Sequence, residues 1–299
     1  MYVVLGASGN TGHVVAKNLL ARGQKVRVVG RNAAHLQPLA AEGAEIFIGD
    51  VADASSLTKA FHKADASYVM IPPTPTSNDY RAHQDRVSDA IAAAVKNAGV
   101  KHVVSLSSFG ADKPSGTGPV AGLHYLEEKL NQIQGANVLH LRAGYFMENT
   151  LPQVGAIRML GSMIGPVSAN LKLPMIATRD IGAAAADALL RLEFQGKLTR
   201  ELQGERDLDY TEAAGIIGKA IDKPDLRYIQ APDNQIRAAM VQMGMSDSFA
   251  GVILEMAGGL NSGHMHTLEP RTATNTTPTK FETFVAETFV PAYRQQAAA

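Results

Sequence analysis

The chain has 299 residues, a formal net charge of zero, and neither cysteine nor tryptophan. Its length suits one large domain or two coupled ones, and its 45% hydrophobic content is ordinary for a globular protein. The missing cysteines exclude disulfides, thiol nucleophiles and thiolate metal sites, and the balanced charge argues against a nucleic-acid partner held mainly through phosphate contacts.

The first residues form a short apolar run, Tyr2 to Leu5, that ends at Gly6. This run has the length of a buried strand, and it lacks the positive start and longer apolar core of a signal peptide. No stretch of the sequence approaches the roughly 18 apolar residues of a membrane span. We therefore expect a cytoplasmic protein without a membrane partner.

Short β-rich runs alternate with helical patterns through the first half of the chain. Strands are expected at residues 2–5, 25–29, 44–48, 66–71, 102–105 and 138–142. Helices are expected at 10–22, 32–42, 53–63, 80–98 and 123–134, the third opened by the capping residue Asp53 and the fourth ended by Gly99. Such alternation with short connections predicts an α/β protein with a doubly wound parallel sheet of the Rossmann type.

The pattern becomes irregular after Gly144. Residues 145–176 are rich in Gly, Met and Pro, and helical patterns return at 181–190, 211–221, 233–243 and 280–293, the first of them with Asp180 as its expected N-cap. We predict a nucleotide-binding domain over residues 1–144. Residues 145–299 are expected to form mainly a smaller substrate-side lobe, with segments that return to the first domain.

The strongest motif is the glycine-rich segment between the first strand and the first helix. Gly6 permits a tight turn, Gly9 lets the backbone approach a pyrophosphate, and Gly12 lets the helix pack closely on the strand. The helix N-terminus offers free N–H groups and the positive end of its dipole to phosphates. The sequence therefore predicts a dinucleotide site that also includes Ser8, Asn10 and Thr11.

The end of the second strand favours NADP over NAD. An NAD site usually has an acidic residue about 20 residues past the glycines, but here Gly30 is followed by Arg31, whose guanidinium suits a 2′-phosphate. The alternative is that Arg31 is a solvated surface charge. NADP, as NADPH, is the expected cofactor, and NAD is the less favoured one.

Two further loops at the ends of strands are candidates for cofactor contacts. Asp50 suits the adenine amino group with Val51 against the ring, or else it is a turn or capping residue. Ile71 and Pro72 follow the fourth strand, where they would wall the cofactor or form only a rigid turn.

Together these features resemble the NmrA-like group of atypical short-chain dehydrogenases/reductases. The resemblance rests on the glycine-rich loop, Arg31, Asp50-Val51, Ser105 to Ser108, Lys129, and the segment from Arg142 to Asn149, and it continues through 177–181 and 278–285. It covers nearly the whole chain and is closest to the NAD(P)H:quinone oxidoreductase branch. The group contains reductases and also redox-sensing regulators that bind the cofactor without turning it over.

The resemblance leaves the catalytic helix open to two interpretations. Tyr125 and Lys129 match the Tyr-x-x-x-Lys of ordinary short-chain dehydrogenases, in which Tyr is the proton donor, Lys holds the nicotinamide ribose, and Ser107 or Ser108 would bind the substrate oxygen. The NmrA-like group instead reads His-x-x-x-x-Lys, which His124 and Lys129 also match. In that alignment Tyr125 is a packing residue with a surface hydroxyl, and His124 either faces the nicotinamide pocket or lies on the surface.

The resemblance also implies that Tyr145, Phe146 and Asn149 border the nicotinamide and the substrate, with ordinary core packing as the alternative, favoured for Phe146. Ser107 is also expected among the cofactor-binding residues. His264 and His266 alternate without an evident third ligand, so no metal site is predicted.

Two functions follow as hypotheses. The first is an NADPH-dependent oxidoreductase that transfers hydride to a small quinone or carbonyl acceptor. The alternative is a non-catalytic NADP(H)-sensing regulator that binds a protein partner. Either protein is expected to be a monomer or a homodimer.

Overall fold

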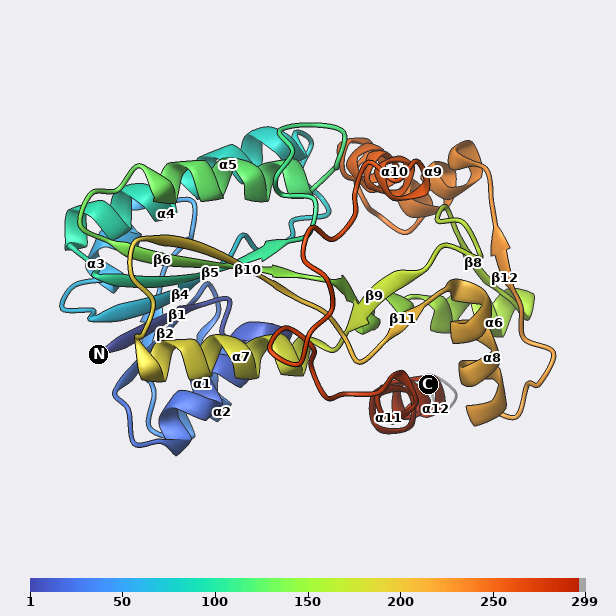
Figure 1. Ribbon diagram of the computed structural model, residues 1–299, viewed down its shortest axis with the longest axis horizontal. Coiled ribbons are helices and arrows are strands. Elements are labelled where there is room, and N and C mark those ends of the chain that lie inside the picture. Colours follow the sequence, from blue (N-terminus) through green and yellow to red (C-terminus); the bar gives the residue numbers. More distant parts are fainter. Residues whose placement is uncertain (296–299) are drawn as a thin grey trace.

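A parallel sheet of seven strands is the centre of the fold in the computed structural model, which describes residues 1–295 (Figure 1). The strand order is β10-β6-β5-β4-β1-β2-β3. The strands are β1 (Tyr2–Leu5), β2 (Val26–Gly30), β3 (Glu45–Ile48), β4 (Ala66–Val69), β5 (His102–Ser108), β6 (Asn137–Ala143) and β10 (Lys197–Leu202). This arrangement confirms the predicted fold class, and it places the topological switch point between β1 and β4, where open α/β sheets bind ligands.

Helices cover both faces of the sheet. The helices α3 (Ala54–Ala60), α4 (Tyr80–Ala98) and α5 (Val120–Asn131) lie on one face, and α1 (Asn10–Ala21), α2 (Gln37–Ala41) and α7 (Thr178–Arg191) lie on the other (Figure 1). Each strand therefore supplies side chains to two cores in alternation: Val3 and Leu5 pack under the first set of helices, and Val4 packs under the second. Burial on both faces explains the continuous apolar runs that predicted these strands.

Two elements from the second half of the chain complete the central sheet and the helices on one of its faces. Strand β10 pairs in parallel with β6, and α7 packs against α1. The two helices approach closely at Gly182, where an added Cβ would lie 2.7 Å from the Cβ of Val14 and 2.8 Å from the carbonyl oxygen of Thr11. β10 and α7 thus lie against elements of residues 1–144. The predicted return of segments to a first domain is part of the domain division, which stays a prediction. A domain boundary at residue 144 stays a prediction.

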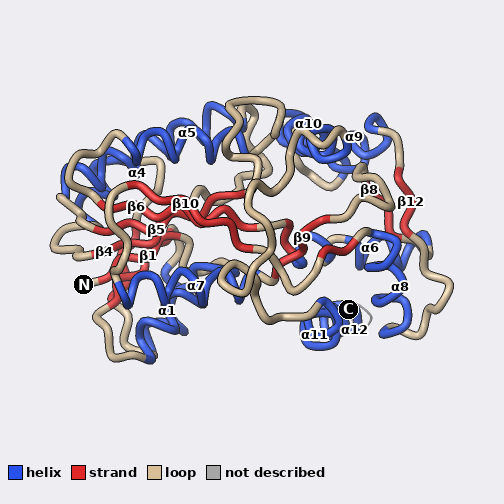
Figure 2. The backbone as a smooth tube through the Cα atoms, in the orientation of Figure 1, coloured by secondary structure: helices blue, strands red, loops and turns tan. Residues whose placement is uncertain are grey.

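The remaining elements form a second lobe at the carboxyl edge of the sheet (Figures 1 and 2). Its small sheets are β11-β9-β7 and β12-β8, built from β7 (Tyr145–Phe146), β8 (Met163–Gly165), β9 (Leu173–Ile176), β11 (Asp207–Leu208) and β12 (Tyr228–Gln230). Its helical segments are η2 (Met147–Thr150), α6 (Gln153–Leu160), α8 (Tyr210–Ala220), α9 (Asp233–Gln242), α10 (Asp247–Asn261), α11 (Phe281–Phe284), the π-helical turn η3 (Val285–Phe289) and α12 (Val290–Gln295). One apolar core, including Phe281 and Phe289, joins most of these elements.

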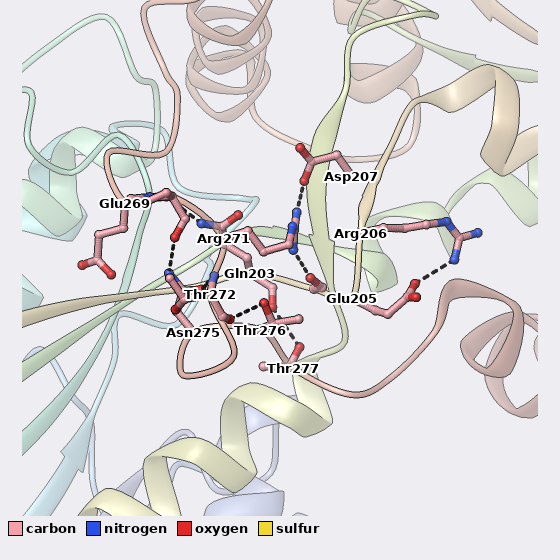
Figure 3. A network of polar contacts seen from close by, with 12 residues as sticks. Gln203, Glu205, Arg206, Asp207, Glu269, Arg271, Thr272, Asn275, Thr276 and Thr277 are labelled. Carbon is pink, nitrogen blue, oxygen red and sulfur yellow. Dashed lines mark hydrogen bonds and ion pairs between the residues drawn. The ribbon is translucent and has the colours of Figure 1, made fainter.

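A polar network fastens the segment before α11 to the end of β10 (Figure 3). The backbone N–H of Gln203 donates to the carbonyl oxygen of Asn275 at 2.8 Å, and the N–H of Thr277 donates to the carbonyl oxygen of Gln203 at 2.9 Å. Arg206 pairs with Glu282 at 2.6 Å. These contacts attach the last part of the described chain to both the sheet and the second lobe.

Several element boundaries differ from the predictions, and two of the differences involve proline. The helix expected over 32–42 is divided into a 3-10 turn, η1 (Ala33–Leu36), and α2, which has Pro38 in its first turn. Proline lacks an N–H and is tolerated at the start of a helix rather than within one. Strand β4 ends at Val69 rather than at residue 71, ahead of Pro72 and Pro73, which cannot donate to a ladder.

No helix within residues 1–295 is both long and apolar enough to cross a membrane.

Candidate functional site

The glycine-rich loop has the geometry that its sequence predicts. Gly6 adopts a φ of +63°, in the left-handed region that side chains rarely occupy. A Cβ on Gly12 would lie 2.3 Å from the carbonyl oxygen of Gly6 and 2.8 Å from that of Leu5. Gly12 thus allows α1 to start directly against the end of β1, as predicted.

The N-terminus of α1 is open to a ligand. Gly9 is the N-cap and supplies no side-chain hydrogen bond to the first turn. Ser8, Gly9 and Asn10 are exposed, whereas Thr11 is buried and its hydroxyl accepts a hydrogen bond from Tyr68 at 2.9 Å. The free N–H groups of the first turn and the helix dipole together favour an anion here. Thr11 fixes the helix against β4, and its predicted contact with the cofactor stays a prediction.

A cavity of about 330 Å³ lies beside this loop. Ser8, Gly9 and Asn10 form one wall, while Glu148, Thr178 and Arg179 from the second half of the chain form another. None of these last three was predicted as a site residue. Their positions depend on where η2 and α7 pack, which no local pattern in the sequence discloses.

The carboxylate of Glu148 holds the start of α7. It accepts the backbone N–H of Thr178 at 3.0 and 3.1 Å and the Thr178 hydroxyl at 2.6 Å. Burial raises the pKa of Glu148, although the hydrogen bonds from Thr178 act in the opposite direction. Glu148 is therefore a partly desolvated acid in the wall of the cavity.

The expected capping role of Asp180 is wrong. Helix α7 begins at Thr178 with Ala177 as its N-cap, so Asp180 lies within the first turn. Its carboxylate instead accepts the Thr279 N–H at 3.0 Å and the Thr279 hydroxyl at 2.7 Å. Asp180 thereby ties α7 to the segment before α11.

The predicted adenine and 2′-phosphate residues lie beyond the ends of β2 and β3. Arg31 is exposed and makes no ion pair among residues 1–295. Asp50 accepts the N–H of Ala52 at 3.0 Å, which agrees with its alternative as a turn residue, and Val51 is half-buried beside it. The contacts expected of Arg31, Asp50 and Val51 with the cofactor stay predictions.

His83 and Arg86 of α4 lie close to this group, and sequence reasoning did not find them. His83 is half-buried and shares a hydrogen bond with Thr74 at 3.0 Å. Burial and the charges of Arg86 and Arg31 lower the pKa of His83, while Asp50 opposes them. Ile71 is buried and Pro72 half-buried in the loop that precedes α4, and their contact with a cofactor also stays a prediction.

Tyr125 and Lys129 lie together, but they face α4. The Tyr125 hydroxyl donates to Asp89 at 3.2 Å, and the Lys129 ammonium meets the same carboxylate at 2.8 Å and lies 4.8 Å from the Tyr125 ring centroid. Glu127, on the other side of α5, is the residue that points at the sheet. His124 is hydrogen-bonded through Nδ1 to the carbonyl oxygen of Ala111 at 2.8 Å. The catalytic roles of Tyr125, Lys129 and His124 stay predictions. These hydrogen bonds and this ion pair join the three side chains to Asp89 and Ala111, and none of these contacts is with the glycine-rich loop.

Ser107 belongs to a buried network between the sheet and α5. Its hydroxyl donates to Glu127 at 2.5 Å, and Arg142 donates to both oxygens of the same carboxylate at 3.0 and 2.6 Å. Glu127 and Ser107 are almost fully buried. This network joins α5 to the carboxyl ends of β5 and β6. The predicted contact between Ser107 and the cofactor stays a prediction.

Tyr145, Phe146 and Asn149 follow β6 at the carboxyl edge of the sheet. The Tyr145 hydroxyl lies 2.9 Å from that of Tyr210, and the two rings meet edge to face. Burial raises the pKa of Tyr145, while the hydrogen bond with Tyr210 acts in the opposite direction. Phe146 is half-buried against the core under α1 and α7, and Asn149 is exposed. Their contacts with the cofactor stay predictions.

Within residues 1–295 the structure shows no cluster of three or more His, Asp or Glu side chains that would hold a metal ion. His264 and His266 instead bind backbone carbonyl oxygens of Ser115 and Gly263.

Comparison with known proteins gives a family match across the chain. The model of the NmrA-like family matches residues 2–285. The chain is 30% identical over 258 residues to the NAD(P)H azoreductase of Xenophilus azovorans, and the match covers 86% of both proteins. It is 27% identical over 266 residues to quinone oxidoreductase 2 of Escherichia coli K12, covering 88% of this chain and 89% of that protein.

Solved structures agree with the fold. The NADPH-dependent quinone oxidoreductase of Escherichia coli, in complex with NADPH, superposes with a TM-score of 0.78 at 24% identity, covering 98% of this chain and all of that one. The triphenylmethane reductase of Citrobacter sp. gives a TM-score of 0.75 at 19% identity over 95% of this chain and 98% of that one.

Proposed function

Because the chain belongs to the NmrA-like family, we propose that it is an NADPH-dependent oxidoreductase that reduces a small quinone or quinone-like acceptor. One observation carries the proposal: the uncapped N-terminus of α1, behind a glycine cradle, opens on a cavity whose other wall comes from the second lobe and α7. The loop supplies a phosphate site, and the facing wall supplies a place for the reacting half of the cofactor and its acceptor. The names of two relatives, an azoreductase and a quinone oxidoreductase, support the reaction class.

The residues present fit an NADP cofactor. Gly9 is exposed at the start of α1, where Gly6 and Gly12 make the tight turn possible, and Arg31 follows β2 without an acid beside it that would repel a 2′-phosphate. The exposed Arg31 guanidinium is not committed to an ion pair among the described residues, so it is available for a phosphate. NADPH is accordingly the preferred form, and NADH the weaker one.

The direction of Tyr125 favours a quinone over a simple carbonyl acceptor. When bound, the nicotinamide supplies the hydride. A carbonyl would become a strongly basic alkoxide that needs a positioned proton donor, whereas a reduced quinone gives a weakly basic phenolate that takes its proton from water. Because Tyr125 and Lys129 contact Asp89 on the side of α5 that faces α4, this chain is better suited to the acceptor that does not require them.

Mixing the protein with NADPH and a panel of quinones, azo dyes and simple ketones, and following loss of the reduced-nicotinamide absorbance, tests the proposal. We expect turnover with quinones, faster with NADPH than with NADH. Arg31→Asp should weaken NADPH binding by about tenfold to a hundredfold, the value of a charge-assisted hydrogen bond, and leave NADH binding nearly unchanged. Arg22→Asp makes the same charge change at an exposed residue at the far end of α1 and serves as the control.

Absence of turnover above background with every acceptor would refute the reductase assignment. Strong discrimination between NADPH and NADP without turnover would then favour the sensing alternative. An Arg31→Asp protein that binds NADPH as tightly as the Arg22→Asp control would refute the 2′-phosphate site.

A further inference from the structure

Glu148 places a carboxyl group in the wall of the cavity. It makes no ion pair among the described residues, and its hydrogen-bond partner is Thr178. The neighbouring cation, Arg179, is directed elsewhere: its guanidinium donates to Glu287 at 2.5 Å and to Thr279 at 3.0 Å. Within residues 1–295, therefore, no guanidinium pairs with the carboxylate in the wall of the cavity.

The carboxylate still has acceptor capacity for a ligand. An ionised carboxylate presents about four lone-pair sites. Thr178 supplies two donor groups, its backbone N–H and its hydroxyl, both from the start of α7. Glu148 also lines the cavity together with Ser8, Gly9 and Asn10. Donor groups of a molecule in the cavity can therefore meet the side of the carboxylate that Thr178 does not use.

The topology of the sheet indicates which part of a dinucleotide comes to Glu148. Arg31 follows β2, the start of α1 follows β1, and Glu148 follows β6 and β7 on the opposite side of β1. A dinucleotide with its 2′-phosphate at Arg31 and its pyrophosphate at α1 extends its other half towards β4, β5 and β6. That half carries ribose hydroxyls and a carboxamide, which are hydrogen-bond donors. A phosphate beside Glu148 would instead be repelled.

We propose that Glu148 binds the nicotinamide–ribose half of the cofactor by accepting hydrogen bonds from its hydroxyl or amide donors, with Thr178 as the residue that positions the carboxylate. This inference rests on the proposed function. The rival role for Glu148 is purely structural, as the acceptor that caps the first turn of α7. If Glu148 binds the nicotinamide half, changing its carboxylate weakens only ligands that carry that half. If its role is purely structural, the change does not distinguish between ligands with and without that half.

Calorimetric titration of the full chain with two ligands separates these roles. One ligand is NADPH, and the other is adenosine 2′,5′-bisphosphate, which lacks the nicotinamide half. Glu148→Gln should weaken NADPH binding about tenfold, because a hydrogen bond to a charged acceptor is lost, and leave the bisphosphate within about twofold. Glu193→Gln, an exposed glutamate just after α7, provides the matched control and should change neither affinity.

Thr178→Val supplies a second variant if Glu148→Gln folds poorly. It removes the hydroxyl that donates to Glu148 and keeps the backbone N–H. We expect NADPH affinity to fall by about threefold with no change for the bisphosphate, since one neutral donor to the carboxylate is removed.

Three results would overturn the proposal. Unchanged NADPH affinity in Glu148→Gln would leave Glu148 with only its contact to α7. Equal losses for NADPH and the bisphosphate would show that the variant acts through the fold. Failure of the unaltered protein to bind either ligand would refute the proposed function itself, and this inference with it.

Discussion

His140 on β6 is expected to make the protein lose stability in mild acid. The side chain is 1% exposed, and its Nε2 is hydrogen-bonded to the Asn131 amide oxygen at 3.0 Å while Nδ1 has no partner among the described residues. Burial lowers the pKa of His140 to about 4; Arg142 and Lys197 also lower it, and Glu127 opposes them. Folding therefore holds the imidazole neutral.

The sign and size of the effect follow from linkage. The unfolded chain binds a proton at His140 below pH about 6.5, whereas the folded chain resists this until pH about 4. The stability that the fold has with a neutral His140 is fully present above pH about 6.5 and is lost as the pH falls towards 4. Between pH 7 and pH 5 the loss amounts to about 2 kcal/mol of the free energy of unfolding.

Urea unfolding at pH 7 and pH 5 measures this loss. His140→Gln retains an amide for Asn131 but cannot titrate, so its stability should fall by about 2 kcal/mol less than that of the unaltered protein between the two pH values. His62→Gln, at an exposed position, should behave as the unaltered protein does. Equal losses in His140→Gln and the unaltered protein would show that His140 does not carry the burial cost inferred for it.

Three other substitutions test the site and its supports. Gly12→Ala should destabilise the protein by about 3 kcal/mol and abolish NADPH binding, because its Cβ would lie 2.3 Å from a backbone oxygen of the loop. Gly215→Ala is the control: its Cβ would meet open space, so it should be neutral or stabilising in urea unfolding. Asp180→Ala should lower the free energy of unfolding by about 2 kcal/mol through loss of both hydrogen bonds to Thr279; an unchanged melting temperature would contradict that tie. Tyr125→Phe should leave the quinone reduction rate within about twofold, and a loss of a hundredfold would make Tyr125 the proton donor after all.

The sequence predicted the sheet well because its strands are short, apolar and regularly separated by helices. The fourth helix, 80–98, has the predicted bounds, and its αL cap is Gly99. Asp53 caps α3 as predicted, accepting the N–H groups of Ser55 and Ser56. Such signals are local, since periodicity and capping residues lie within one element.

The strands of the second half of the chain were predicted less well because their formation depends on pairing with strands that are distant in the sequence. Strand β10 is polar along most of its length, so it lacks the apolar pattern of a buried strand and was not expected at 197–202. Its place is set by pairing with β6, some 60 residues earlier. The two-residue strands β7 and β11 exist only through their pairing with β9, and no local pattern marks them.

The catalytic helix illustrates a different limit. Spacing placed Tyr125 and Lys129 on one face of α5, and the structure confirms that they share a face. The buried residues Leu126, Glu127 and Leu130 lie on another side. The apolar residues on this side could have shown that it faces the sheet, and so that Tyr125 and Lys129 do not. Glu127 interrupts the apolar pattern in the sequence, since its burial depends on its ion pair with Arg142 in β6.

The amino-acid sequence by itself determined the strand–helix alternation, the glycine-rich loop and the cation after β2, because each depends on residues close together in the chain. Only the tertiary structure decided what faces that loop. Thr178 and Arg179 reach the cavity because α7 packs against α1, and Glu148 lies there because it is hydrogen-bonded to the start of α7. All three residues lie more than 130 residues further along the chain than the loop. Packing and hydrogen bonding between distant segments set that contact, and no single stretch of sequence contains both of its sides.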